Sequence, residues 1–228
     1  MAIETVSWPD FLKRFRWRQG EHVAVMAPTG AGKTTLIGEI LPIRSHVIFL
    51  GTKKKDKLYD ALIKQGYYRV ESFHDIKPWM KRVILWPKHE STINATINKQ
   101  TARFLTAFDG IANQGGWCCV ADEAKYMAEM LKLTKSLTFM QEQLRSNHGT
   151  NVSGAQRPFW LPRSVLSNAS HVFLWKTTDA DDIKRLADIG GINRREVARE
   201  LSTLGKHEFV YIYTRGTEAT AMRSQVRK

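Results

Sequence analysis

Short runs of apolar residues alternate along this chain with longer segments in which apolar residues recur at helical spacing. Continuous apolar runs indicate buried strands, and spacings of three and four indicate helices with one buried face. The runs predict strands at residues 22–27, 47–50, 68–71, 82–86, 117–121, 151–155, 171–175 and 209–213. The helical patterns predict helices at residues 33–41, 56–65, 95–112, 124–133, 179–189 and 193–204. This alternation favours an α/β fold with a mostly parallel central sheet flanked by helices on both faces.

The same pattern divides the chain into one main unit with two short extensions. Residues 1–20 are predicted to be a helical lead-in, because Phe11, Leu12 and Phe15 share one face. Residues 21–213 contain the predicted strands and form a single domain of ordinary size. Residues 214–228 are polar and basic, and we expect them to be a loose tail.

The composition of the chain is unusual in its net charge. The chain has 35 Lys and Arg against 22 Asp and Glu, a formal charge of +13. This excess indicates a polyanionic partner such as DNA or RNA, although a basic surface kept for solubility is the alternative. The hydrophobic content of 43% is that of an ordinary globular protein.

Cysteines and targeting signals say little about chemistry. Cys118 and Cys119 are neighbours on a predicted strand, so they point to opposite faces and are expected to be buried, unbridged thiols. The first residues lack a charged start followed by an apolar stretch, and no window approaches the ~20 apolar residues that cross a bilayer. We therefore expect a protein of the cytoplasm without membrane insertion.

A phosphate-binding loop is predicted between the strand at 22–27 and the helix at 33–41. The run from Ala27 to Thr34 nearly satisfies the Walker A pattern, with Ala27 where the first Gly usually stands. Glycines let backbone N–H groups turn towards one anion, and the helix N-terminus adds its positive dipole. The predicted nucleotide-binding residues are Pro28, Thr29, Gly30, Ala31, Gly32, Lys33, Thr34 and Thr35. Lys33 is expected to bridge the β- and γ-phosphates of ATP, and the Thr34 hydroxyl to ligate Mg²⁺.

An acidic pair, Asp122 and Glu123, ends the apolar strand at 117–121 in the Walker B arrangement. Buried parallel strands deliver their last residues to the edge where ligands bind. Asp122 is therefore expected to hold Mg²⁺, and Glu123 to orient and deprotonate the attacking water. The alternative is a pair that only caps the following helix. A Glu directly after the Walker B Asp is typical of ring motors, helicases and recombinases.

After this pair, a short predicted strand ends in Gln156, followed by Arg157 and Pro158. Together with the two Walker motifs, this resembles the FtsK/HerA superfamily of DNA-pumping ATPases, in which a strand ends in a Thr-Gln-Arg-Pro-like motif. The resemblance covers most of the chain and is strongest to the small genome-packaging ATPases of phages and viruses. Here Ala155 stands where Thr is usual.

The resemblance implies a RecA-like ATPase that works as a homo-oligomeric ring on double-stranded DNA, with ATP and Mg²⁺ as cofactors. Gln156 would be the γ-phosphate sensor. Arg145 would be an arginine finger acting on the neighbouring subunit, with Arg157 as the second candidate; a solvated basic face is the alternative for either. A packaging role would add a portal or capsid-vertex protein as partner and place the protein in the host cytoplasm or on the virion.

Two further basic segments remain open. Lys53, Lys54, Lys55 and Lys57 follow the strand at 47–50 and are either a pore loop that grips the DNA backbone or a plain solvated loop. Residues 179–204 are either a helix-turn-helix that presents Arg194, Arg195 and Arg199 to DNA, or a helix pair that covers the sheet, which we favour.

The sequence therefore predicts an ATP-driven DNA translocase that packages a genome. Its rivals are another DNA pump for segregation, conjugation or phage assembly, a P-loop small-molecule kinase, and a DNA-binding module that uses ATP only as a structural ligand.

Overall fold

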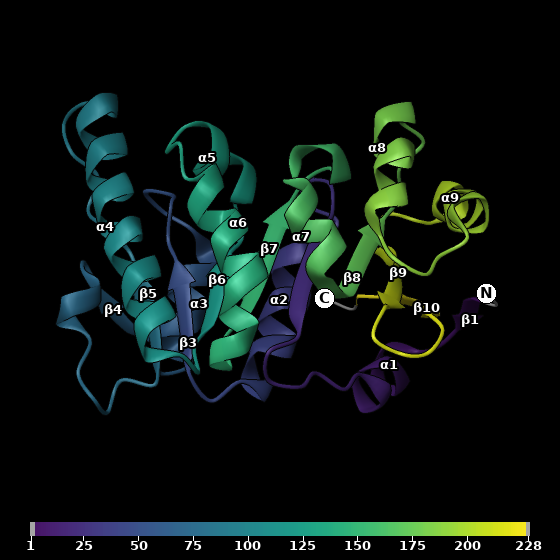
Figure 1. Ribbon diagram of the computed structural model, residues 1–228, viewed down its shortest axis with the longest axis horizontal. Coiled ribbons are helices and arrows are strands. Elements are labelled where there is room, and N and C mark those ends of the chain that lie inside the picture. Colours follow the sequence, from purple (N-terminus) through teal and green to yellow (C-terminus); the bar gives the residue numbers. More distant parts are fainter. Residues whose placement is uncertain (1–2, 227–228) are drawn as a thin grey trace.

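The computed structural model describes residues 3–226 as a ten-stranded mixed sheet with helices packed on both faces (Figure 1). The strands are Ile3–Thr5 (β1), His22–Met26 (β2), Val47–Leu50 (β3), Tyr68–Val70 (β4), Arg82–Leu85 (β5), Cys118–Ala121 (β6), Thr150–Ala155 (β7), Ala169–Trp175 (β8), Glu208–Tyr213 (β9) and Thr220–Gln225 (β10). Their order across the sheet is β1-β10-β9-β8-β2-β7-β6-β3-β5-β4. The strands from β8 to β4 in this order run parallel, whereas β9 is antiparallel to both β8 and β10.

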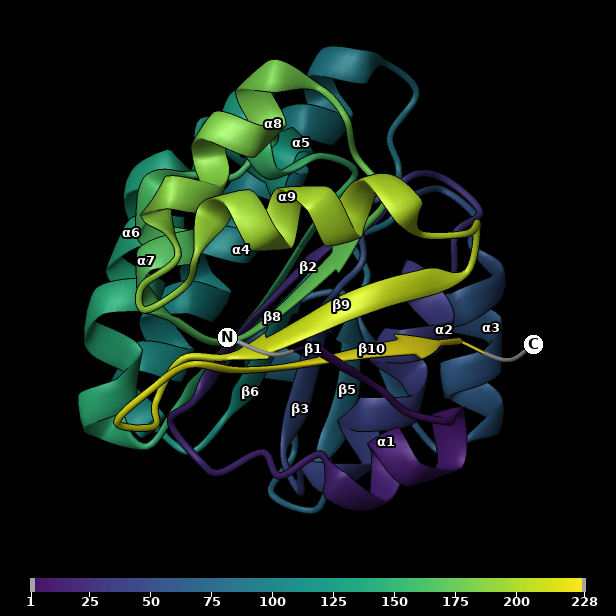
Figure 2. The same cartoon turned by 90° about the vertical axis from the view of Figure 1, so that its right-hand side faces the viewer.

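The helices cover the two faces unequally. They are Trp8–Arg14 (α1), Lys33–Ile40 (α2), Lys57–Lys64 (α3), Ile93–Gln114 (α4), Ala124–Glu129 (α5), Thr134–Gln143 (α6), Arg163–Asn168 (α7), Ala180–Arg185 (α8) and Arg194–Thr203 (α9). Short 3₁₀ helices lie at Leu41–Ile43, Phe73–Asp75, Leu144–Asn147, Pro158–Trp160 and Leu186–Asp188. Helices α1, α2 and α3 lie on one face, and α4 to α9 lie on the other (Figure 2). The predicted α/β fold with a mostly parallel sheet is confirmed.

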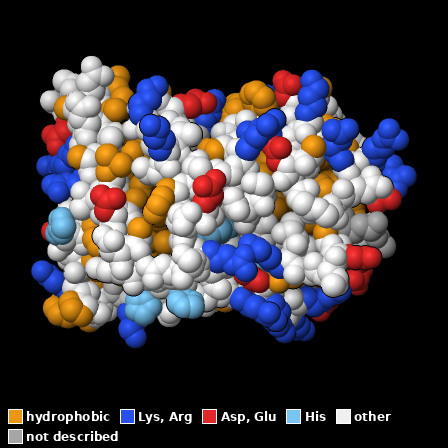
Figure 3. All heavy atoms as spheres, viewed as in Figure 1, with side chains coloured by type: hydrophobic (Ala, Val, Ile, Leu, Met, Phe, Trp, Pro, Cys, Tyr) orange, Lys and Arg blue, Asp and Glu red, His pale blue; other side chains and the backbone are white. Residues whose placement is uncertain are grey.

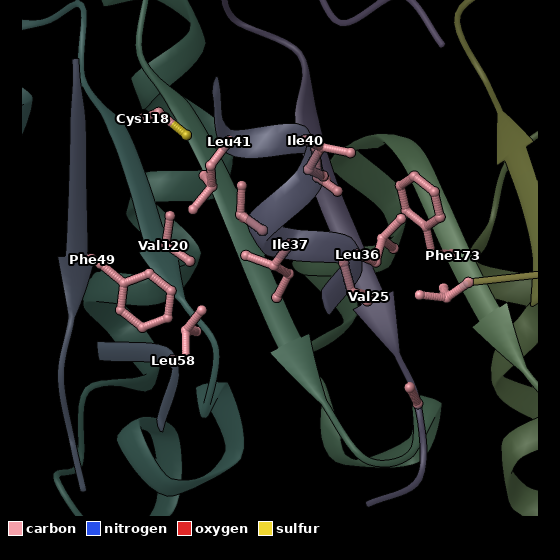
Figure 4. Close-up of a cluster of buried hydrophobic side chains, with 14 of the residues drawn as sticks. Val25, Leu36, Ile37, Ile40, Leu41, Phe49, Leu58, Cys118, Val120 and Phe173 are labelled. Carbon is pink, nitrogen blue, oxygen red and sulfur yellow. The ribbon is translucent and has the colours of Figure 1, made fainter. Parts of the chain in front are cut away.

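The core forms because the central strands are apolar on both sides. Every residue of β2, β3 and β6 is buried, as expected for parallel strands covered on both faces. On one face, Leu36, Ile37 and Ile40 of α2 pack against side chains of the central strands (Figure 4). Cys118 and Cys119 are buried and unbridged, as predicted, and burial raises the pKa of the Cys118 thiol to about 12.

The structure corrects the two ends of the chain. The stretch expected to be a loose tail contains β10, and Val226 beyond it is buried against Gly32. The segment joins the sheet because its backbone pairs with β9 and because Arg223 bridges Glu200 and Glu208. At the other end, α1 lies within the predicted helical lead-in, but the unpredicted strand β1 precedes it and pairs with β10.

The helix pair α8 and α9 covers the sheet. Val197 and Leu201 on the inner face of α9 are buried in one cluster with Val210 and Ile212 of β9. Arg194, Arg195 and Arg199 remain exposed on its outer side. No helix within residues 3–226 is both long enough and apolar enough to span a bilayer.

Candidate active site

The carboxyl ends of four adjacent parallel strands bring the predicted site residues together. In sheet order these strands are β2, β7, β6 and β3, and they are followed by the phosphate loop, Gln156, the acidic pair and the lysine-rich loop. Because parallel strands end at the same edge, these segments meet in one cleft. The cleft has a volume of about 410 Å³ and is lined by Ala27, Pro28, Thr29, Gly30, Gly32, Lys33, Thr34, Thr35, Lys53, Asp122, Glu123 and Gln156.

The phosphate loop has the backbone that a bound anion requires. Gly30 and Gly32 have φ angles of 75° and 113°, values that disfavour any residue with a side chain. Gly32 caps α2, so Lys33 and Thr34 open the helix and its N–H groups face the cleft. Ala27, which replaces the usual Gly, is buried and donates its N–H to the carbonyl of Ala155, so a small side chain fits there.

The loop is held from outside by residues that the sequence did not indicate. The indole Nε1 of Trp175, the last residue of β8, donates to the carbonyl of Ala31 at 2.9 Å, and His207 Nδ1 lies 3.1 Å from the same oxygen. Val226 packs against Gly32, where an added Cβ would lie 3.3 Å from the Cβ of Val226. The C-terminal segment therefore supports the phosphate loop.

Lys33 and Asp122 form an ion pair at the centre of the cleft. The Lys33 ammonium lies 2.7 Å from Asp122 Oδ1 and donates to the backbone oxygen of Asp122 at 2.8 Å. Oδ1 therefore makes an ion pair with Lys33 and no other contact to a donor within the described residues. The Asp122 carboxylate and the Thr34 hydroxyl line the same cleft, and both are the hard oxygen ligands that Mg²⁺ prefers.

Glu123 is held by a lysine of the next loop. Lys53 Nζ lies 2.9 Å from Glu123 Oε1 and 2.9 Å from Asp56 Oδ2. The two carboxylates raise the pKa of Lys53 despite its partial burial, so it stays protonated. The base of the loop is fixed, because Trp86 Nε1 donates to the Lys53 carbonyl at 2.7 Å and Tyr59 accepts from the Thr52 N–H.

The contact with Glu123 distinguishes Lys53 from the other three lysines of the loop. Lys53 lines the cleft although its side chain is 44% exposed, and Lys54, Lys55 and Lys57 are exposed beside it. No ion pair of these three lysines occurs within residues 3–226. The loop therefore connects the candidate catalytic carboxylate with an exposed basic surface.

Gln156 and Arg157 are neighbours in the sequence, but their side chains have different surroundings. Gln156 is exposed and lines the cleft, where a sensor must lie. Arg157 binds the first turn of helix α8 and its N-cap, with Nη2 2.5 Å from Asp179 Oδ1 and Nε 3.2 Å from Asp182 Oδ2. These two carboxylates occupy Arg157, which makes it a poor candidate for a finger.

Arg145 does not join the cleft of its own subunit. It lies in the 3₁₀ helix that precedes β7, at the amino end of the sheet, whereas Gln156 follows the same strand at the carboxyl end. The six residues of β7 span roughly 20 Å at ~3.3 Å per residue, more than the length of an arginine side chain. Any phosphate that Arg145 contacts therefore belongs to another molecule.

The fold is similar to that of solved P-loop ATPases. The genome-packaging NTPase B204 from Sulfolobus turreted icosahedral virus 2, solved with AMPPCP, has a TM-score of 0.61 and 14% identity over 88% of this chain and 96% of that chain. VirB4 of Thermoanaerobacter pseudethanolicus has a TM-score of 0.66 and 10% identity over 91% and 89%. The pCW3 conjugation coupling protein TcpA has a TM-score of 0.55 and 12% identity over 89% and 59%.

No family model and no curated protein matches the sequence. At 10–14% identity these neighbours show the fold, and it is the fold that the resemblance in the motifs implies.

Proposed function

We propose that this chain hydrolyses ATP to translocate double-stranded DNA, and that it works as a homo-oligomeric ring which packages a genome. The observation that carries the proposal is the cleft, in which Lys33, Asp122, Glu123 and Gln156 meet at one edge of the sheet. The charge of +13 and the exposed lysines beside the cleft support a polyanionic substrate.

Each cleft residue has a role in this reaction. The backbone of Gly30 to Thr35 and the Lys33 ammonium bind the phosphates of ATP. Thr34 and Asp122 would hold Mg²⁺, which would supply positive charge beside the phosphates. Glu123 accepts a proton from the water whose oxygen attacks the γ-phosphorus, while the bond to the β-phosphate oxygen breaks and ADP leaves with the electron pair. Gln156 orients that water or contacts the γ-phosphate.

Lys53 couples the catalytic carboxylate Glu123 to the loop that is proposed to contact DNA. Lys53 Nζ occupies Glu123 Oε1 at 2.9 Å, so this contact must be released before that oxygen can take a proton from water. Lys54, Lys55 and Lys57 belong to the same loop and are the proposed contacts to the DNA backbone. Contacts of this kind give affinity without base specificity, which suits a translocating motor.

The position of Arg145 supports the proposed ring, if Arg145 is the finger. A finger at the opposite edge of the sheet from its own cleft serves only a neighbouring subunit. Head-to-tail contacts of this kind close into a ring when the rotation allows it. Packaging is favoured because the chain matches 96% of the length of the viral packaging NTPase B204, and a portal or capsid-vertex protein is then the proposed further partner. The likeness to VirB4 and TcpA makes another DNA pump the second candidate.

The test is ATP turnover with and without double-stranded DNA, at low and high salt, for wild type, Glu123→Gln and Arg145→Ala. We expect DNA to stimulate turnover and salt to weaken the stimulation. Both variants should lose it, and the loss of a finger is typically ~10³–10⁵-fold. Turnover that is independent of DNA and insensitive to Arg145→Ala would contradict the proposal and favour a small-molecule kinase.

A further inference from the structure

The candidate cleft contains no arginine of its own. Its lining residues, which all lie within the described part of the chain, supply two lysines, Lys33 and Lys53, and both are paired with carboxylates. Arg157, which lies next to Gln156, is bound to Asp179 and Asp182. The positive charge that a transferring phosphoryl group needs is therefore incomplete within one subunit.

A group of arginines lies at the opposite, amino edge of the sheet. Lys and Arg side chains gather along the lower edge of the molecule, between the lower ends of the central strands and α1 (Figure 3). Arg145 packs beside Gly20, two residues before β2, where an added Cβ would lie 3.4 Å from its Cγ. Arg215 follows β9, and its Nε donates to Ser170 Oγ near the start of β8 at 3.0 Å. Since β7, β2 and β8 are adjacent, the two arginines extend from one edge.

Within the described residues, the base of Arg215 and its Nε are held by hydrogen bonds, whereas its two Nη groups are not. Thr214 donates its N–H to the Ser170 carbonyl at 3.0 Å and its hydroxyl to the Ala169 carbonyl at 2.8 Å, which fixes the backbone at the base of Arg215. The Ser170 contact uses Nε and leaves both Nη groups without a partner in residues 3–226. Two free Nη groups on a fixed guanidinium match the geometry of a phosphate.

No carboxylate within the described residues pairs directly with either guanidinium group at this edge. Neither arginine forms an ion pair within the described residues, whereas five other described arginines do. The nearby carboxylate of Glu21 makes its hydrogen bonds with His171, Tyr213 and the Arg18 N–H. Burial and then the positive charge of Arg145 lower the pKa of Arg215, whereas the charge of Glu21 opposes this shift. Two guanidinium groups at one edge, neither of them in an ion pair within the described residues, are both available to contact an anion.

We propose that Arg215 acts together with Arg145 as a two-arginine clamp, which closes on the triphosphate bound in the cleft of the neighbouring subunit. The inference rests on the proposed ring ATPase and adds Arg215 as a second residue supplied in trans. The clamp provides at the next cleft the charge that the cleft lacks, and it makes hydrolysis depend on correct contact between subunits.

The test separates a residue that acts in trans from one that acts in its own subunit. Arg215→Ala alone should lower DNA-stimulated turnover at saturating DNA at least tenfold, and Arg215→Lys should recover part of it. Arg215→Ala should also leave the Kd for a non-hydrolysable ATP analogue unchanged, because its own phosphate loop is intact. Lys33→Ala, inactive by itself but with both arginines, should restore turnover when it is mixed with Arg215→Ala, as it should with Arg145→Ala.

Controls make each outcome decisive. Arg103→Ala, which removes a partly exposed arginine of α4, should behave as wild type. The thermal midpoint of Arg215→Ala, read by circular dichroism, establishes that the variant is folded. Recovery with Arg145→Ala but not with Arg215→Ala would overturn the clamp, and so would a loss of DNA affinity that saturating DNA repairs. Absence of recovery in both mixtures overturns the trans assignment of both residues. Wild-type turnover without DNA stimulation would instead count against the proposed function.

Discussion

At the scale of single residues, Gly154 sets the distance between two strands of the cleft. It lies in β7 beside Asp122, and a Cβ at this position would approach both the backbone oxygen and Oδ1 of Asp122 to 2.6 Å. Moving either atom is costly in free energy, because one belongs to the backbone and the other is paired with Lys33. The glycine therefore allows Asp122 to reach the cleft.

We predict that Gly154→Ala displaces Asp122 and weakens binding of Mg²⁺ and ATP at least tenfold. Overpacking of this kind typically costs about 1–3 kcal/mol in the free energy of unfolding. Isothermal titration with an ATP analogue and urea unfolding measure the two effects. Gly38→Ala in α2 is the matched control, since its Cβ would meet nothing within 4 Å, and it should stabilise the protein by about 0.4–1 kcal/mol. Unchanged binding in Gly154→Ala would contradict the prediction.

The residues of the cleft differ in how far the sequence predicts them. Lys33 and Glu123 follow from local motifs, because a strand followed by a Gly-rich turn or by two carboxylates fixes where the side chains lie. Lys53 belongs to a run of lysines in which no local feature marks the one that turns inwards. Its contact with Glu123 depends on β3 lying next to β6, which is a property of the sheet order.

At the scale of elements, the predicted strands are those with a strong apolar pattern. β2, β3 and β6 are buried on both faces, so their sequences are continuous apolar runs. β10 lies outside the predicted strands because most of its residues are small or polar, and it is kept in place by pairing with β9 and β1 and by the ion pairs of Arg223. A strand without a continuous or alternating apolar pattern carries little signal in a single sequence.

Asp182 of α8 joins the segment after Gln156 to the outer helices. Its buried carboxylate accepts from Arg157 Nε, from the Phe159 N–H at 3.1 Å and from the Thr177 hydroxyl at 2.8 Å. On the other side of this segment, Lys125 of α5 lies over the ring of Trp160 at 3.7 Å. The position of Gln156 therefore depends on a loop that is fixed between α5 and α8.

We predict that Asp182→Asn lowers ATP turnover while ATP binding stays intact, because Gln156 loses its fixed position and the phosphate loop does not. Weakening the acceptor for the Phe159 N–H and the Thr177 hydroxyl should also cost about 1–3 kcal/mol in the free energy of unfolding. Single-turnover hydrolysis and urea unfolding give the two values. Asp181→Asn, exposed on the same helix, should change stability by no more than about 0.5 kcal/mol. Equal turnover in the two variants would show that the loop does not position Gln156.

At the scale of the whole molecule, buried titratable groups at the amino edge tie the helical lead-in to the sheet. His171 Nε2 lies 2.9 Å from Glu21 Oε2, and its Nδ1 lies 2.8 Å from the Tyr211 hydroxyl. Tyr213 donates to Glu21 Oε1 at 2.9 Å. These partners fit an ionised Glu21 and a neutral His171 that donates from Nε2. His22, the first residue of β2, is also buried and accepts the Asn151 N–H at Nδ1, so it too is neutral.

The stability of the fold should therefore fall as the pH is lowered. Burial and then the charges of Arg215 and Arg145 lower the pKa of His22 to about 4, and burial also lowers the pKa of His171. Both histidines bind fewer protons folded than unfolded, so their contribution is complete above pH ~6.5 and is lost as the pH falls towards the folded values. Hydrogen bonds from His171, the Arg18 N–H and Tyr213 outweigh burial and lower the pKa of Glu21 to about 2, which adds a second loss between pH ~4.5 and ~2.

For His22 alone, a pKa lowered from 6.5 to about 4 corresponds to roughly 3 kcal/mol that is present at pH 7 and absent below pH 4. Urea unfolding followed by circular dichroism at pH 7, 5.5 and 4.5 measures this slope. His22→Asn, whose side-chain oxygen can still accept the Asn151 N–H, should be less stable at pH 7 and should show a shallower slope. A wild-type free energy of unfolding that stays constant from pH 7 to 4.5 would mean that neither histidine is kept neutral by the fold. A slope that His22→Asn leaves unchanged would assign it to His171, and the arginines at the amino edge would then have no measurable effect on His22.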